Sequence, residues 1–157
     1  MTNFTSKEAM KIAGCTYRQL DFWARQEYVT PSITPALGSG THREYSFTDV
    51  IKLCILTKTS SLGINLNNFA KSLNENSDVL SENDSELLAL TDGGRQVELM
   101  RVQDAFSLIV AGGNIIVFLN LLAIRKEINE LIAKMPPREI RGRKSGISKI
   151  KKVVNHA

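Results

Sequence analysis

The chain has 157 residues, of which 43% are hydrophobic and 6% aromatic. These values suit one globular domain or two very small ones, and they give no sign of a large aromatic-lined cofactor pocket. The formal net charge is +4. No apolar run approaches the roughly 18 residues that a membrane-spanning helix needs, and the first residues lack the pattern of a signal peptide. We therefore expect a cytoplasmic protein with no membrane partner.

A first helix is expected from Thr5 to about Ala13. Thr5 and Glu8 have the spacing of a capping box, in which each side chain satisfies a backbone N–H of the other residue. Gly14 then supplies a turn.

A second helix is expected over Thr16–Gln26, where Thr16 and Gln19 repeat the capping-box spacing. Its apolar side should face the core and consists of Leu20, Phe22, Trp23 and Ala24. Its polar side is left toward solvent or a ligand and consists of Tyr17, Arg18, Gln19 and Asp21.

Pro31 and Pro35 forbid a continuation of the second helix. Two short strands are expected next, Val29–Ile33 and His42–Tyr45. The loop between them contains two glycines, which permit a sharp reversal. The result would be a hairpin that carries basic residues.

A third helix is expected from about Phe47 to Leu62, where Gly63 ends it, followed by a short fourth helix over residues 66–73. Residues 74–86 are polar and acidic, which predicts a linker or a frayed helix end.

Residues 87–134 predict a small α+β unit in the order strand, strand, helix, strand, helix. The expected elements are Leu87–Thr91, Gln96–Met100, Val102–Ala111, Ile115–Leu119 and Leu121–Lys134. The Asp-Gly-Gly-Arg sequence after Thr91 is a good hairpin turn, and Gly112-Gly113-Asn114 would be a second turn. Such a unit buries only a modest core alone, which favours docking onto a second copy.

Charge is spread unevenly along the chain. Residues 1–73 carry eight basic and five acidic side chains, residues 74–135 carry five and ten, and residues 136–157 carry seven and one. Basic ends around an acidic middle favour nucleic-acid contacts at the ends. The basic tail has few core-forming residues, so we expect it to be disordered when free, and it could clamp DNA non-specifically or only aid solubility.

No catalytic or metal-binding pattern is evident. Cys15 and Cys54 form no CxxC pair and stand near no histidine at ligand spacing. His42 and His156 accompany no evident triad. We therefore expect no cofactor, no metal and no enzymatic activity.

The runs TYRQLDFWARQEYVTPS and GSGTHREYSFTDV, with the helix ending LGINLNNF, make residues 3–75 resemble the MerR-like winged helix-turn-helix, closest to compact actinobacterial versions. Residues 87–134 resemble the short C-terminal domain of that subgroup. The resemblance implies a mainly α fold with small β: a winged helix-turn-helix plus a C-terminal α+β (ββαβα) domain. Residues 1–75 would be the DNA-binding domain, and residues 76–86 would be a linker. Residues 87–135 would dimerise or bind a partner or an effector, and residues 136–157 would form the basic tail.

The resemblance also implies function: sequence-specific binding of double-stranded DNA as a homodimer that controls transcription, at the nucleoid. Helix 16–26 would enter the major groove, and the wing, 29–45, would contact the flanking backbone. The long dimerisation helix and the cysteine ligands of other members are missing, and Thr41-His42-Arg43 replaces a common Gly-Tyr-Arg wing.

The expected DNA-binding residues are Lys7, Thr16, Tyr17, Arg18, Gln19, Arg25, His42, Arg43 and Tyr45. Arg18 and Gln19 have the side chains that read guanine and adenine. Arg43 and His42 would contact phosphate or the minor groove. The resemblance makes Arg43 and Tyr45 the wing arginine and tyrosine, and Arg25 the basic residue at the helix end. The alternative is that these residues form an ordinary solvated surface that does not contact DNA.

Two other classes of function stay open. One is an architectural or recombination accessory protein of excisionase type, and the other is an adaptor whose residues 87–134 recruit a protein. RNA polymerase or another protein is a possible further partner. The sequence does not distinguish an activator from a repressor.

Overall fold

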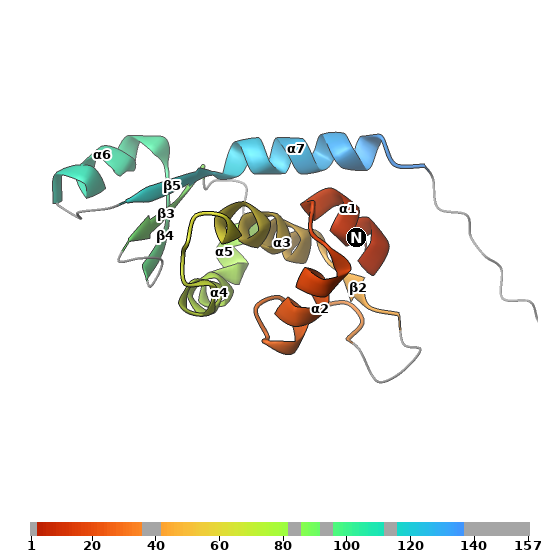
Figure 1. Cartoon of the computed structure of the whole chain (residues 1–157). Helices are drawn as coiled ribbons and strands as arrows, with labels where there is room; N and C mark the ends of the chain where they lie inside the picture. The colour runs from red at the N-terminus through yellow and green to blue at the C-terminus, as the bar shows by residue number, and fades with distance from the viewer. Residues whose placement is uncertain (1–2, 36–41, 82–85, 92–95, 112–115, 137–157) are drawn as a thin grey trace, which may run out of the picture.

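The structure is a computed structural model, and it describes residues 3–35, 42–81, 86–91, 96–111 and 116–136. Its elements are β1 (Phe4–Thr5), α1 (Ser6–Ala13), α2 (Tyr17–Arg25), β2 (Glu44–Tyr45), α3 (Phe47–Ser60), α4 (Leu66–Glu75), α5 (Ser77–Ser81), β3 (Leu87–Thr91), β4 (Gln96–Met100), α6 (Val102–Ala111), β5 (Val117–Asn120) and α7 (Leu121–Ala133). Helix α7 runs along one side of the molecule, over α3 and α1, while α6 and the strands β3–β5 lie at one end (Figure 1). Within the described residues, no helix combines the length and the apolarity needed to cross a membrane.

The first two helices begin as the sequence predicts. The Thr5 backbone N–H donates to Glu8 Oε2 at 2.7 Å, and the Glu8 N–H donates to Thr5 Oγ1 at 3.3 Å. Thr16 and Gln19 form the same reciprocal pair at the start of α2. Gly14 ends α1 with φ of 67°, a left-handed conformation that favours glycine. Both capping boxes are therefore confirmed.

The strand pairing differs from the prediction. β2 pairs antiparallel with β1, so that Tyr45 faces Phe4. The predicted strand Val29–Ile33 is wrong: this part of the chain has no strand, and only an isolated bridge joins Thr34 to Glu44. Pro31 has no N–H to donate to a ladder. The predicted glycine loop lies within 36–41, outside the described residues.

Helix α3 is the centre of the core. Ser46 and Asp49 cap its start, and its buried apolar residues are Val50, Ile51, Leu53, Cys54, Ile55 and Leu56. Gly63, with φ of 70°, makes the turn that leads to α4. In the segment predicted as a linker, residues 77–81 form α5, and its Leu80 is fully buried.

The strands β3, β4 and β5 form an antiparallel sheet in the order β4-β3-β5. On one face, Leu88 and Leu90 join the main core. On the other face, Ala89 packs in a smaller cluster with Met100 and with Ala105 from α6. β3 and β4 have the predicted bounds, whereas β5 begins two residues later than predicted. The predicted turns 92–95 and 112–114, together with residue 115, lie outside the described residues.

Helix α7 joins the C-terminal part of the chain to the core of the N-terminal part. Its Leu121, Ile124 and Ile128 belong to the same buried cluster as Leu20 and Phe69. The helix lies against α1 and α3. A side chain of α7, Arg125, is buried and donates to the Leu80 carbonyl of α5 at 3.0 Å. Both parts of the chain therefore contribute to one hydrophobic core.

Candidate nucleic-acid interface

Helix α2 buries one side and exposes the other. Leu20 and Trp23 are buried, whereas Tyr17 and Arg18 are exposed. The expectation that Phe22 faces the core is wrong, because its side chain is 51% exposed. A residue two positions from Leu20 points roughly 200° away from it on a helix. The Phe22 ring instead meets the Tyr28 ring edge-on, with 6.1 Å between the centroids.

Asp21 connects α2 to the residue that precedes β2. Its Oδ1 accepts a hydrogen bond from Arg43 at 3.1 Å, and its Oδ2 accepts one from Arg25. Desolvation disfavours the charged Asp21, but the two arginines outweigh it and lower the pKa of its carboxyl. The carboxylate therefore holds Arg43 beside α2, although the two residues are 22 positions apart in sequence.

Arg43 is only 20% exposed at its side chain. Desolvation opposes its charge, yet the hydrogen bond to Asp21 and the nearby Tyr45 raise its pKa. Arg25, in contrast, is largely exposed at the end of α2. Arg25 and Arg43 therefore place two positive charges at the outer side of α2. Of the two, Arg43 is the one held firmly by the residues around it.

Tyr45 does not lie on the surface. It is fully buried, and its hydroxyl has no hydrogen-bond partner among the described residues. Burial raises the pKa of this hydroxyl, while the neighbouring Arg43 opposes the rise. The prediction that Tyr45 contacts DNA directly is therefore wrong. Its side chain packs in the core instead.

Thr16 and Gln19 are occupied with capping. Gln19 Oε1 accepts from the Thr16 N–H at 2.9 Å and from the Thr16 hydroxyl at 3.0 Å. A bidentate contact to adenine needs both the carbonyl and the amide group of glutamine. Gln19 can therefore bind adenine in this way only if its hydrogen bonds to Thr16 break. Arg18 is thus the better candidate for a base contact.

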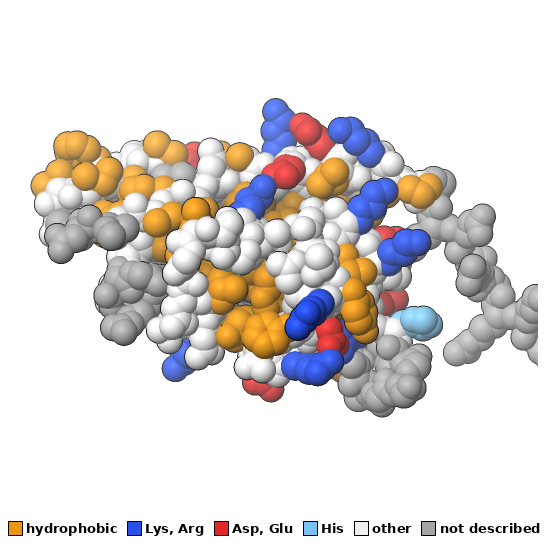
Figure 2. Space-filling view, viewed as in Figure 1, with side chains coloured by type: hydrophobic (Ala, Val, Ile, Leu, Met, Phe, Trp, Pro, Cys, Tyr) orange, Lys and Arg blue, Asp and Glu red, His pale blue; other side chains and the backbone are white. Residues whose placement is uncertain are grey.

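The remaining predicted residues are exposed. Lys7 lies on α1, and His42 directly precedes Arg43. In the region of α2, Figure 2 shows basic side chains beside acidic and hydrophobic ones. The surface is thus mixed in chemistry, with the acidic Asp21 balancing part of its charge.

Two polar connections that the sequence did not reveal tie the segments around α2 to α3 and α4. Asn74 Nδ2 donates to the carbonyls of Glu27 and Tyr28, at 3.1 and 3.2 Å, and Lys52 donates to Asn74 Oδ1 at 2.9 Å. Glu27 has φ of 57°, which is uncommon for a residue other than glycine. Asn74 therefore fixes the strained turn after α2 to α4.

The second connection is the Asp49 carboxylate at the start of α3. Its Oδ2 accepts from the Ser32 N–H, the Ser32 hydroxyl and the Ser46 N–H, at 2.9, 2.6 and 2.8 Å. The Ser46–Asp49 spacing is that of a capping box and could have been found from the sequence. The contact to Ser32, 17 residues away, could not.

The two cysteines are buried in the core. Burial raises the pKa of Cys15, and it raises the pKa of Cys54 to about 12. Both thiols are therefore protonated at neutral pH, whereas metals and electrophiles react with thiolates. Within the described residues, no three His, Cys, Asp or Glu side chains are grouped as metal ligands would be.

The capped helices α1 and α2 are joined at a glycine turn, and α2 exposes its outer side. This arrangement defines a helix-turn-helix protein. Residues 4–76 match the family model described as MerR HTH family regulatory protein, so this segment is similar to that family. The resemblance predicted over residues 3–75 is thereby confirmed.

The chain is 33% identical, over 112 residues, to uncharacterized HTH-type transcriptional regulators of Mycobacterium tuberculosis (strain ATCC 25618 / H37Rv) and Mycobacterium bovis (strain ATCC BAA-935 / AF2122/97). The match covers 71% of this chain, so it extends beyond the family segment. It covers 50% of each relative, so the chain spans about half the length of the curated relatives it matches. These relatives are named as regulators and not as enzymes.

Proposed function

We propose that this chain is a sequence-specific DNA-binding transcriptional regulator that binds an operator as a homodimer. Helix α2 enters the major groove, and residues 29–45 act as a wing on the flanking backbone. The observation that carries the proposal is the link from Arg43 to Asp21 at 3.1 Å, beside the exposed side of α2. A winged helix-turn-helix needs its recognition helix and its wing on one side of the molecule in this way.

In this arrangement each residue has a distinct role. Arg18 reads a base edge, because it is exposed near the start of α2, where recognition helices make base contacts. Arg25 and Arg43 bind backbone phosphates, which can replace the Asp21 carboxylate as the anionic partner. Lys7 and His42 lie at the edge of the contact, and residues 87–135 serve dimerisation or a protein partner.

Selection of bound sequences from a random DNA pool tests the proposal. We expect a defined motif with two related half-sites, since a symmetric dimer binds a symmetric operator. Recovery of no enriched sequence at moderate salt would show that binding is non-specific or absent. An architectural protein would differ by bending DNA and spreading along it without a discrete site.

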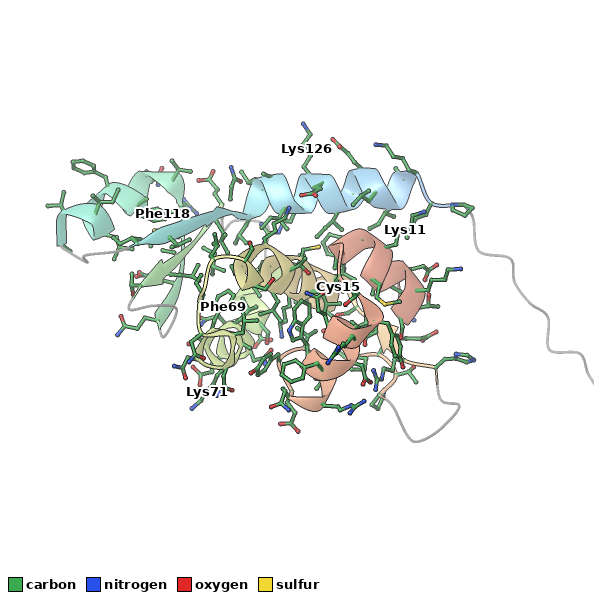
Figure 3. The ribbon with its side chains drawn as sticks, in the orientation of Figure 1. Lys11, Cys15, Phe69, Lys71, Phe118 and Lys126 are labelled. Carbon is green, nitrogen blue, oxygen red and sulfur yellow. The ribbon has the colours of Figure 1, made fainter. Side chains whose placement is uncertain are left out.

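Arg43→Ala is expected to weaken binding to every DNA sequence by about 1–2 kcal/mol, because a phosphate contact carries no sequence information. Lys126→Ala is the matched control: it removes the same charge from α7, where Lys126 projects away from α2 (Figure 3). Affinities measured by fluorescence anisotropy on specific and scrambled duplexes check this. An effect confined to the specific duplex, or an equal loss in the control, would contradict the role of Arg43.

Arg18→Ala is expected to relax the preference at one base position, with a loss of about 1–3 kcal/mol of discrimination there. Competition binding with operators that differ at single base pairs measures this. Unchanged discrimination at all positions, with a uniform loss of affinity, would make Arg18 a phosphate contact instead.

A further inference from the structure

Helix α6 is apolar on two sides, and the fold covers only one of them. Ala105 and Leu108 pack on the sheet, in the cluster that includes Ala89 and Met100. A second set of apolar side chains points into solvent, with exposed fractions of 59% for Val102, 71% for Phe106, 55% for Ile109 and 68% for Val110. We call these four residues the α6 stripe.

The α6 stripe has the pattern of a helix face that packs against another surface. Its members stand at positions i, i+4, i+7 and i+8, which span roughly 100° of the helix circumference. Soluble helices that are apolar on both sides are normally buried on both. The polar residues Gln103, Asp104 and Ser107 occupy the remaining side, so that no charge interrupts the stripe.

We propose that the α6 stripe is the contact between two copies of this chain. This proposal deepens the homodimer of the proposed function. The stripe presents roughly 400–500 Å² of apolar surface, a size that on monomers often marks an interaction site. That is over half of the roughly 800 Å² per partner that a standard interface buries.

A second copy fits this surface better than a partner of different chemistry. Two identical stripes meet across a two-fold axis without opposing charges, since an isologous contact must be complementary to itself. The stripe lies at the end of the molecule away from α2 and β2 (Figure 1). Pairing through α6 would therefore leave both α2 helices at the outer ends, where they can reach two half-sites.

Analytical ultracentrifugation of the full chain without DNA tests the contact. We expect a dimer at micromolar concentrations, and we expect Phe106→Asp with Val110→Asp to raise its dissociation constant by about 100-fold or more. The matched control is Leu62→Asp with Leu122→Asp, because both leucines are exposed outside the stripe. This control should remain dimeric. Circular dichroism melts establish that both double variants are folded.

A monomeric parent chain, or a dimer that persists in the α6 variant, would overturn the proposal. DNA binding gives a separate readout, because the α6 variant should bind a single half-site as well as the parent does and lose affinity only on the full operator. If DNA binding fails while the α6 dimer stands, the proposed function is wrong and the contact is right.

Discussion

Ile128→Ala should lower the free energy of unfolding by about 3 kcal/mol, and the loss should appear at α2 as well as at α7. Ile128 is 1% exposed and belongs to the same buried cluster as Trp23. Removing its side-chain carbons loses their burial and leaves a cavity that the surrounding helices can fill only in part. Because the cluster is continuous, the parts of the chain that share it should unfold in one transition.

Trp23 makes this prediction easy to measure, since it is the only tryptophan of the chain and lies in α2. Urea unfolding followed by its fluorescence should shift together with the far-ultraviolet circular dichroism. Leu122→Ala is the control, because Leu122 lies on the same helix but is exposed. Unfolding of α7 with an unchanged Trp23 transition would show that the two parts are independent domains.

Asp49→Ala should lower the free energy of unfolding by about 2–4 kcal/mol. Asp49 is buried, and one of its oxygens accepts three hydrogen bonds. Alanine would leave the Ser32 and Ser46 donors without this partner and would remove half of the α3 capping box. The acceptor is buried, and hydrogen bonds to a charged group contribute more than those between neutral groups.

Asp104→Ala is the control for this variant, because Asp104 is also an acidic residue in the first turn of a helix but is exposed. Its loss should cost less than about 1 kcal/mol, from the helix dipole alone. Asp49→Asn, which keeps one acceptor, should fall between the two. Equal effects of the two alanine variants in urea unfolding would show that the contact to Ser32 contributes nothing.

Local signals in the sequence were enough for several elements. The capping boxes at Thr5 and Thr16 depend on residues three positions apart, and both form as predicted. The strands 87–91 and 96–100 follow from a turn signal between two apolar runs, and their bounds are correct. In each case the contacts that decide the structure lie within a few residues.

Non-local contacts account for the errors at β2 and at Tyr45. The partner of β2 is β1, some 40 residues earlier in the chain. A strand of two residues is too short to show a periodic pattern in the sequence. Tyr45 is buried, because that pairing places it against Phe4, and the expected contact of Tyr45 with DNA is therefore wrong. The position of Arg43 beside Asp21 likewise depends on how the chain folds back onto α2. Only the resemblance to the MerR-like winged helix-turn-helix indicated that Arg43 lies near this helix.

The shared core has a practical consequence for anyone who studies DNA binding with a shortened protein. A fragment that ends at residue 76, the limit of the family segment, would lack Leu80, Leu88, Leu90, Leu121, Ile124 and Ile128. The apolar surfaces of α1, α3 and α4 that these residues cover would then meet water. Such a fragment should aggregate during expression, and its failure to bind an operator would say nothing about the intact chain.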